Sequence, residues 1–545
     1  MNRFTVFLTF MFFLISLLKG VAQDENSYVL LHDSVETSNG IQLATDIYLP
    51  DNDHTFPVIL VRTPYKKEHF KYDATLFTKQ GYAVVVQDCR GKFGSGGDFY
   101  PFVNERIDGL KTVDWIKKQS WCKDKIAGYG GSYVGYTQWA IADQLDAICP
   151  DLTGANIYDL LYPQGLFSLS LAFNWGMAVD SHKENAIDPD KKAKSFWYLP
   201  LSVADDSTYH DSQFINDWIL HEQENQYWKD FNHRKFAKGP VLSIAGWYDI
   251  FLLAQISDFV EIDRHNNHPG NKMVIGPWCH GSQSYKNGYG GADKVGNTAL
   301  LKERFLSKNL LGKEVEVMET PYTDSKYNLF IMERNTYYGS ETWPPKEVEK
   351  VDLFLDVNKI TERKPEKENR LHYIYDPMKP YPNLGGSFLG SDVGPAIQNP
   401  NSDRCDQWVF ESDILTDPVT LLGSISASLL VSSNVETTDF IILVQDLFPN
   451  DTIINIQEGG KRVRLEKDKV NRIEIESWPT GYQLNPGHKL RIAITSSWFP
   501  RYNRSLNSEE PVYHAVESKQ AIHTIYLGGE YPSKITLPLL NPGKR

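Results

Sequence analysis

The stretch KIAGYGGSYVGYTQW, residues 125–139, is the part of this sequence that best indicates its fold. It begins as a short apolar run, passes through Gly130 and Gly131, presents Ser132 and continues as an amphipathic helix. Small residues let a strand turn sharply into a helix and leave a hydroxyl exposed at the turn. The start of a helix also offers free N–H groups and a positive dipole end, which suit a developing oxyanion. Ser132 is therefore a candidate nucleophile.

The glycines of this turn have an unusual spacing. The common nucleophile elbow is Gly-x-Ser-x-Gly, whereas here the second glycine, Gly135, comes one residue late. Taken alone, the pattern fits an ordinary strand-to-helix turn as well as an elbow. The rest of the chain must therefore decide between the two.

Length and composition narrow the class of protein. A chain of 545 residues is expected to form two or three domains, and 41% hydrophobic residues can fill sizeable cores. The net charge is −13, and an acidic surface argues against nucleic acid or an anionic membrane as a partner. We expect a small-molecule or acylated substrate instead. The oligomeric state is left open.

Residues 1–22 are typical of a secretory signal peptide. Arg3 supplies the positive start, residues 4–18 are apolar, and Gly20-Val21-Ala22 provides small residues before a cut ahead of Gln23. A membrane anchor is the alternative, but the apolar run is short for a span. No other stretch approaches 18 apolar residues, so we expect no membrane contact after cleavage. The mature chain is predicted to be exported, to the periplasm or out of the cell.

The five cysteines do not suggest a metal site. Their number is odd, so at least one thiol has no internal disulfide partner, and no two of them show metal-ligand spacing. We expect no metal and no cofactor.

Residues 23–149 have the pattern of the first part of an α/β domain. Two strands joined by Ser38-Asn39-Gly40 predict a hairpin at 28–48. The continuous β-branched runs at 56–65 and 82–91 are typical of strands buried on both faces of a parallel sheet. Apolar residues at helical spacing predict a helix at 104–119, and the alternation implies right-handed crossovers.

Residues 150–238 are rich in aromatic side chains and contain no clear parallel strand. Residues 214–228 are predicted to form one helix. We interpret the whole region as a helical cap inserted into the α/β domain. Some of its aromatic residues should line a pocket, with Phe173 and Trp175 as candidates.

The sheet pattern resumes at 239–325. Two apolar strands, at 239–251 and 272–281, each end in glycine, an aromatic residue and one polar residue, Asp249 or His280. Ligands bind at the carboxyl ends of strands in open α/β sheets, so both side chains lie where a site is expected. The chain order Ser132, Asp249, His280 is that of the α/β-hydrolases.

Residues 326–545 change character again. Short alternating segments separated by turn residues replace helical periodicity, which predicts an antiparallel β-sandwich or jelly roll. Its first strand is predicted in YNLFIMER, residues 327–334. The proline- and glycine-rich stretch 376–400 is interpreted as a long loop.

These features together resemble the cocaine esterase and X-Pro dipeptidyl peptidase family of serine hydrolases. The resemblance covers essentially the whole mature chain and implies an α/β-hydrolase domain with a cap, followed by a jelly roll. It also explains the late glycine, because Gly-x-Ser-Tyr-x-Gly is the elbow of that family. The matching motifs are RTPY (62–65), QDCRG (87–91), GGSYVG (130–135), GWYDIF (246–251), GPWCHG (276–281) and WFPRYNRSLN (498–507).

The pattern and the resemblance assign roles to five residues. Ser132 is expected to attack an acyl carbonyl, His280 to take its proton, and Asp249 to orient and stabilise His280. The N–H of Tyr133, the residue after the nucleophile, should face the oxyanion. The resemblance implies that the hydroxyl of Tyr65 is the second donor. We interpret Asp88 and Arg90, which also match the family, as scaffold.

The residues that follow Asp249 bear on which acyl group the enzyme accepts. Related α-amino acid ester hydrolases carry carboxylates shortly after the triad aspartate, where this chain has Phe251 and Leu252. We therefore expect an apolar acyl pocket that includes these two residues and Trp247, and such a pocket favours an esterase. An X-Pro dipeptidyl peptidase, or an α-amino acid ester hydrolase or acylase, is the first alternative. The second is an accessory esterase or a glycan-binding protein that acts on acylated polysaccharide.

Overall fold

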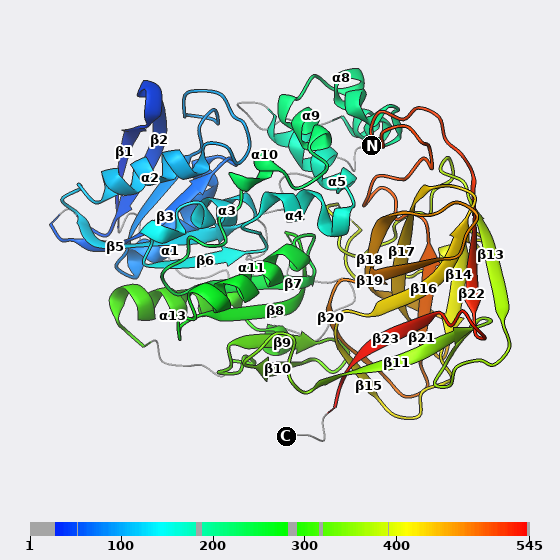
Figure 1. Ribbon diagram of the computed structural model, residues 1–545. Helices are drawn as coiled ribbons and strands as arrows, with labels where there is room; N and C mark the ends of the chain where they lie inside the picture. The colour runs from blue at the N-terminus through cyan, green and yellow to red at the C-terminus, as the bar shows by residue number, and fades with distance from the viewer. Residues whose placement is uncertain are drawn as a thin grey trace, which may run out of the picture.

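The computed structural model describes residues 28–51, 53–180, 188–281, 292–314, 320–390 and 392–541. It contains one mixed α/β part and one all-β part, which confirms the predicted fold class. Figure 1 shows the α/β part on the left, the β-sandwich on the right and a group of short helices above the junction between them. The predicted signal peptide, residues 1–22, lies outside the described residues.

The α/β part is built on one ten-stranded sheet with the order β1-β2-β4-β3-β5-β6-β7-β8-β9-β10. Neighbours from β4 to β9 pair in parallel, whereas β1, β2 and β10 pair antiparallel at the two edges. The strands are β1 (Val29–Glu36), β2 (Gln42–Leu49), β3 (Phe56–Thr63), β4 (Ala83–Asp88), β5 (Cys122–Gly131), β6 (Ala147–Asp151), β7 (Leu242–Tyr248), β8 (Lys272–Cys279), β9 (Tyr327–Ile331) and β10 (Thr336–Ser340). The predicted hairpin and parallel strands are present, and β6 is a strand that the sequence analysis did not identify.

Helices cover both faces of this sheet, which is why its central strands are apolar throughout. Val58 and Leu60 of β3 face the same core as α2 and α11, whereas Ile59 and Val61 face α1 and α13. This alternation is the two-residue period of a strand. The helices are α1 (Lys71–Lys79), α2 (Glu105–Ile116), α3 (Tyr133–Trp139), α11 (Leu252–His265), α12 (Ala292–Val295) and α13 (Thr298–Leu306).

A group of short helices between β6 and β7 forms the cap. They are α4 (Ile157–Leu161), α5 (Leu169–Leu171), the π-helical turn η6 (Ala172–Gly176), α6 (Met177–Val179), α7 (Pro189–Trp197), α8 (Ala204–Thr208), α9 (Gln213–Leu220) and α10 (Gln226–Lys229). The single helix predicted at 214–228 is wrong. The chain breaks after Leu220 because the buried apolar positions of α9 end there and Asn225 begins a new helix by capping the N–H of Tyr227.

The β-sandwich begins later than predicted. β9 and β10 extend the α/β sheet, with β9 parallel to β8, so the first sandwich strand is β11 and not the segment predicted at 327–334. A short apolar segment does not reveal its partner strand. The sandwich strands are β11 (Val348–Asp356), β12 (Lys359–Thr361), β13 (Asn369–Tyr375), β14 (Gln407–Glu411), β15 (Val419–Gly423), β16 (Ser426–Ser433), β17 (Thr437–Leu447), β18 (Ile453–Arg464), β19 (Asn471–Glu476), β20 (Thr480–Leu484), β21 (Lys489–Thr495), β22 (Ala521–Leu527) and β23 (Lys534–Leu540).

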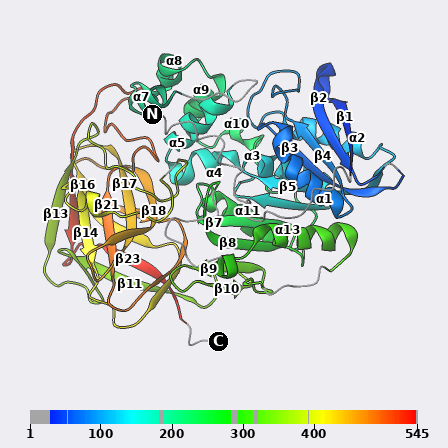
Figure 2. The ribbon, with the colours of Figure 1, turned by 180° about the vertical axis from the view of Figure 1, so that it is seen from behind.

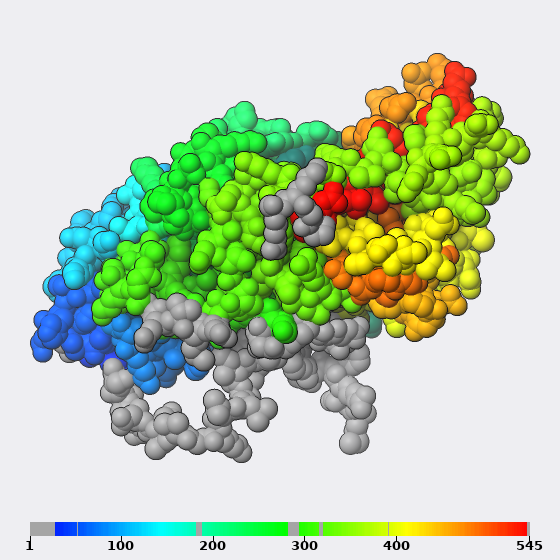
Figure 3. Space-filling view, turned by 90° about the horizontal axis from the view of Figure 1, so that it is seen from below, coloured from blue at the N-terminus to red at the C-terminus, as the bar shows by residue number. Residues whose placement is uncertain are grey.

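The sandwich packs directly against the α/β part. The N–H of Met332, just after β9, donates to the carbonyl of Gly481 in β20 at 2.8 Å. Gln457 of β18 donates to the carbonyl of Trp247 at the end of β7 at 2.9 Å. Figure 2 shows the same junction from behind, and Figure 3 shows from below that the parts form one continuous body. The end of β7 is therefore held from the sandwich.

Candidate active site

Ser132 lies at a sharp turn between β5 and α3. Its own backbone has φ +56° and ψ −130°, a conformation that a non-glycine residue adopts only under strain. Gly130, at φ +124°, has no room for a side chain, because a Cβ there would lie 2.4 Å from Val134 Cγ1. The N–H of Ser132 donates to the carbonyl of Asp151 in the neighbouring strand at 2.9 Å. The turn is therefore anchored and presents the hydroxyl at the carboxyl end of the sheet.

The late glycine has a packing reason. A Cβ on Gly135 would lie 2.5 Å from Cγ2 of Thr153, which follows β6. The same threonine donates its hydroxyl to the carbonyl of Ser132 at 2.7 Å. Thr153 thus presses on the first turn of α3 and also holds the elbow, and only glycine fits at position 135.

Asp249 and His280 lie beside Ser132 because of the register between β7 and β8. Tyr248 pairs with Cys279, so the next residue of each strand reaches the same place. Ser132 Oγ lies 3.0 Å from His280 Nε2, and His280 Nδ1 lies 2.8 Å from Asp249 Oδ2. The structure brings these three predicted residues together in the order that a proton relay requires.

The carboxylate of Asp249 is fully buried and points away from solvent. Its Oδ1 accepts the N–H of Phe251 at 2.8 Å, which leaves Oδ2 for the imidazole. The side chain of His280 is 7% exposed. A buried carboxylate on Nδ1 selects the tautomer in which Nε2 can accept a proton from Ser132.

The hydroxyl of Tyr65 belongs to the same group. The ring follows β3, and its hydroxyl accepts the indole N–H of Trp175 at 2.9 Å. Ser132 and the backbone of Tyr133 lie close to this hydroxyl and act on its pKa. Burial raises the pKa of Tyr65 to about 12, so it carries its proton at neutral pH. Tyr65 and Tyr133 both lie where the sequence analysis expected oxyanion donors.

The side chain of Tyr133 points away from the nucleophile into a buried charged group. Its hydroxyl donates to Glu105 Oε1 at 2.8 Å and accepts the N–H of Phe102 at 2.8 Å. Glu105 Oε2 in turn lies 3.0 Å from Arg62 Nη1, and both side chains are buried. This set of contacts fixes the backbone of Tyr133 from below.

The QDCRG segment, residues 87–91, has a supporting position. Asp88 accepts the N–H groups of Lys67 and Gly94 at 2.8 and 3.2 Å, and burial raises its pKa to about 6. Arg90 donates to Asp108 on α2. Both side chains therefore order loops around the elbow, as their interpretation as scaffold requires.

The predicted pocket residues divide into two groups. Phe251 contacts the ring of His280 edge-on, with centroids 5.0 Å apart, and Trp175 contacts Tyr65 as described above. Phe173 and Leu252 are fully buried in cores, and Leu252 packs in the core of the α/β part rather than near His280. Leu252 points away from Phe251 because consecutive residues at the start of a helix point in different directions. Phe173 packs in the same cluster as Phe251 and Trp175, and its part in a pocket stays a prediction.

Trp247 is also wrongly predicted as a pocket residue. It is fully buried, its N–H donates to the carbonyl of Phe330 at 2.6 Å, and its ring lies close to Trp343. Its ring also lies against Gly481 of β20, so Trp247 faces the sandwich, whereas Asp249 comes after the end of β7 and turns to the site.

Two further features near the site were not predicted. Phe102 and Trp218 stack with Trp175 at centroid distances of 5.7 and 6.3 Å. The sandwich loop at 386–394 also reaches the cap, since Asn174 donates its amide to the carbonyl of Leu389 at 2.9 Å. Leu389 packs against the aromatic core of the cap. The only signal in the sequence was the unusual length of the glycine-rich stretch.

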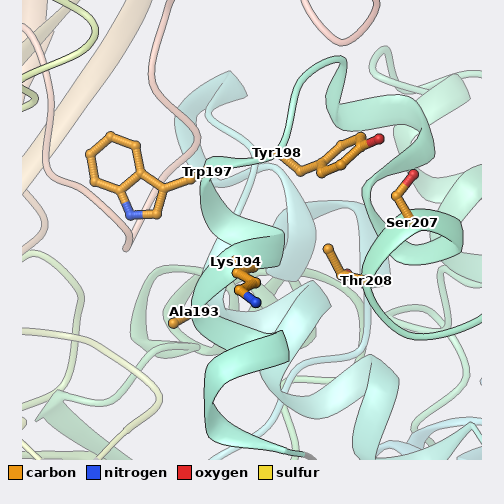
Figure 4. A pocket seen from close by; sticks show the side chains of 6 residues that line it. All are labelled: Ala193, Lys194, Trp197, Tyr198, Ser207 and Thr208. Atoms are coloured by element: carbon orange, nitrogen blue, oxygen red, sulfur yellow. The ribbon is translucent and has the colours of Figure 1, made fainter.

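Other hollows and clusters lie apart from Ser132. A hollow of about 480 Å³ on the cap is lined by Ala193, Lys194, Trp197, Tyr198, Ser207 and Thr208 (Figure 4). The carboxylates of Asp205, Asp206 and Asp211 lie close together on the cap, and two of these residues are exposed. Such exposed acidic groups are common in proteins and do not by themselves indicate a metal site. Among the described residues, no helix is long and apolar enough to cross a membrane. The five cysteines, all of them among the described residues, form no disulfide.

Comparison with known proteins gives matches along nearly the whole chain. The profile of the X-Pro dipeptidyl-peptidase (S15) family matches residues 39–282, and the profile of the X-Pro dipeptidyl-peptidase C-terminal non-catalytic domain matches residues 321–536. A cocaine esterase from Rhodococcus sp. (strain MB1 Bresler) is 29% identical over 577 residues, which cover 95% of this chain and 99% of that protein.

Solved structures share the fold. An aminopeptidase from the marine sediment archaeon Thaumarchaeota archaeon has a TM-score of 0.84 at 19% identity, covering 97% of this chain and 99% of that one. An α-amino acid ester hydrolase has a TM-score of 0.81 at 19% identity, covering 99% of this chain and 100% of that one.

Proposed function

We propose that this chain, which matches the X-Pro dipeptidyl-peptidase (S15) family and its C-terminal domain at residues 39–282 and 321–536, is an exported serine hydrolase that cleaves acyl esters. The observation that carries the proposal is the row of contacts from Ser132 through His280 to Asp249, at 3.0 and 2.8 Å. Serine hydrolases need these three groups in this order.

The proposed reaction proceeds through an acyl-enzyme. Ser132 Oγ attacks the acyl carbonyl while His280 Nε2 removes its proton and then gives that proton to the departing alcohol. Asp249 keeps the imidazole in place and stabilises its charged form. A water molecule repeats the sequence in reverse and releases the acid. His280 must be neutral at the start, so activity should fall when the imidazole becomes protonated.

Two donors are proposed to hold the oxyanion. The N–H of Tyr133 is available because it begins α3, and the hydroxyl of Tyr65 keeps its proton because burial raises its pKa to about 12. In other hydrolases, removing one such donor costs about 3 kcal/mol of transition-state stabilisation.

The acyl group is proposed to be apolar or aromatic. Phe251 contacts the imidazole and Trp175 lies beside Tyr65, so aromatic surface flanks the hydroxyl of Ser132 on two sides. The cocaine esterase relative acts, by its name, on an ester. Leu252 does not support this proposal, since it faces the core of the α/β part, so the proposal rests on Phe251 and Trp175.

An X-Pro dipeptidyl peptidase is the second candidate, and the family description favours it. Turnover of a Gly-Pro anilide above that of simple aryl esters would support this candidate. An esterase for acylated polysaccharide is a narrower form of the first candidate, and an acetylated-glycan substrate would test it.

The nucleophile is tested by Ser132→Ala together with Ser257→Ala, a control on the exposed face of α11. Ser132→Ala should abolish hydrolysis of aryl esters and labelling by a fluorophosphonate, and Ser257→Ala should change neither. Full esterase activity in Ser132→Ala would refute the proposal.

Export is proposed from residues 1–22. The protein recovered from outside the cytoplasm should begin at Gln23. A product that keeps Met1 and stays in the cytoplasm would contradict export without affecting the proposed chemistry.

A further inference from the structure

Tyr65 has an unusual set of neighbours for a phenol that must donate a hydrogen bond. A tyrosine hydroxyl has one hydrogen to donate and lone pairs to accept with. The indole N–H of Trp175 approaches it, with 2.9 Å between the nitrogen and the hydroxyl oxygen. An indole N–H can only donate.

The number of hydrogens therefore restricts where the phenol proton points. Since Trp175 supplies its own hydrogen, the oxygen of Tyr65 is the acceptor in this bond. Its single hydrogen has to point away from Trp175. Ser132 lies close to the same hydroxyl, so this hydrogen is available to the carbonyl oxygen of an ester that Ser132 attacks.

Trp175 is itself held rigidly. Its ring stacks on Tyr133, Phe102 and Trp218 at centroid distances of 5.8, 5.7 and 6.3 Å, with interplanar angles of 29°, 26° and 11°. It lies in the π-helical turn η6, a type of turn that is rare and often found at functional sites. The preceding residue, Asn174, is tied to the sandwich through the carbonyl of Leu389.

This arrangement connects the cap with the oxyanion hole. The cap region spans 150–238, whereas Tyr65 and Tyr133 belong to the α/β sheet. A hydrogen bond donated to a hydroxyl also strengthens the bond that this hydroxyl donates onward, because the two polarise each other. The indole N–H would thus act on the transition state without touching the substrate's carbonyl.

We propose that Trp175 is a positioning residue whose indole N–H orients the hydroxyl of Tyr65 toward the oxyanion, so that the cap completes the oxyanion hole. The inference rests on the proposed esterase function. In this proposal the cap helps to stabilise the transition state, in addition to any role in acyl-group specificity.

The test is a double-mutant cycle of kcat on one aryl ester, with the full chain and the variants Trp175→Phe, Tyr65→Phe and the pair. Trp175→Phe keeps an aromatic ring in the stack and removes only the N–H. We expect kcat to fall about tenfold with KM changed less than about twofold, because the interaction is made in the transition state. Tyr65→Phe should lower kcat by about 10²-fold.

The decisive comparison is the double variant. If Trp175 acts through Tyr65, Trp175→Phe should have no further effect, within about twofold, once Tyr65 is phenylalanine. A full tenfold loss in that background, or no loss in the wild-type background, would overturn the proposal. Trp218→Phe is the matched control, since it alters the same stack and lacks a bond to Tyr65 among the described contacts.

A second variant and a second measurement guard against misfolding. Trp175→His keeps a ring N–H and should retain more kcat than Trp175→Phe. An arylboronic acid, which forms a tetrahedral adduct with serine, should bind about tenfold more weakly to Trp175→Phe. Equal boronate binding in wild type and Trp175→Phe would overturn the proposal. If a fluorophosphonate did not label the wild-type protein at all, the proposed function itself would instead be refuted.

Discussion

The elbow around Ser132 and the seam between cap and sandwich are held in different ways. Elbow contacts join residues close in sequence, such as Thr153 to Ser132, which are 21 positions apart. Seam contacts join residues that are 215 to 336 positions apart; among them are Gln164 with Glu476 and Gly460, Ser168 with Arg501, Phe167 with Asn503, and Asn174 with Leu389. A motif can therefore specify the elbow, whereas the seam exists only once the whole chain has folded.

Their buried charges differ as well. Below the elbow, Glu105 is paired with Arg62 and hydrogen-bonded to Tyr133, and among the described residues only Nη2 of Arg62 in this pair is buried without a hydrogen-bond partner. At the seam, Glu458 Oε2 and two guanidinium nitrogens of Arg501 are buried with no hydrogen-bond partner among the described residues. Unsatisfied buried charge is costly, so the seam should respond to pH more strongly than the elbow does.

The largest expected effect is on stability at the elbow. Glu105→Ala leaves Arg62 as an unpaired buried charge and should lower the free energy of unfolding by about 3–5 kcal/mol, measured by denaturant unfolding. Glu314→Ala is the control, because the Lys308–Glu314 pair has nearly the same distance, 2.9 Å, but is exposed. It should cost less than about 1 kcal/mol. Equal losses would show that burial does not distinguish the pairs.

The next effect concerns pH at the seam. Burial raises the pKa of Glu458 to about 7, although Arg501 opposes the shift. The folded state therefore holds this proton more tightly than the unfolded chain, whose carboxyl titrates near pH 4.5. Stability from this group is complete below pH 4.5 and is lost as the pH rises through 7, by up to about 3 kcal/mol.

Glu458→Gln should remove that dependence. Its unfolding midpoint should change less between pH 5 and pH 8 than that of the wild type, as thermal melts at each pH would measure. A wild-type stability that rises across this range, with the same rise in the variant, would contradict the assigned pKa.

The site was predictable from the sequence where the reacting groups end apolar strands. Asp249 and His280 each follow a buried strand directly, and parallel strands bring their carboxyl ends to one edge. The bond from Trp175 to Tyr65 was not predictable, because no pattern in the sequence reveals a contact between an irregular cap and a strand end. The pairing of β9 with β8 was missed for the same reason, because the residues of β9 predict a strand but do not reveal which strand it pairs with.

A smaller effect should appear at the first turn of α3. Gly135→Ala places a methyl group 2.5 Å from Thr153 Cγ2, which must shift the elbow. Displacing a nucleophile by a fraction of an ångström to one ångström should lower kcat on aryl esters by about 10- to 100-fold. Gly96→Ala is the control, since its new methyl group would make only an ordinary contact at 3.6 Å. Unchanged kcat in Gly135→Ala would mean that Thr153 moves aside.

The smallest effect concerns the polar contacts of the seam. One side chain, Gln164, donates to the carbonyl of Glu476 at 2.8 Å and accepts the N–H of Gly460 at 3.0 Å. Gln164→Ala removes both bonds and should cost about 1–2 kcal/mol, seen as a lower midpoint of thermal unfolding. Catalysis should change little, because Ser132, His280 and Asp249 are held by other contacts.

Gln213→Ala is the control that distinguishes loss of the seam contacts from the loss of any glutamine side chain. Gln213 bonds only within one helix, to Asp217 at 3.0 Å, so its removal should leave the midpoint nearly unchanged. If Gln164→Ala lowered kcat as strongly as Gly135→Ala, the seam would have to support the elbow as well. The separation between a locally built elbow and a seam built by distant residues would then fail.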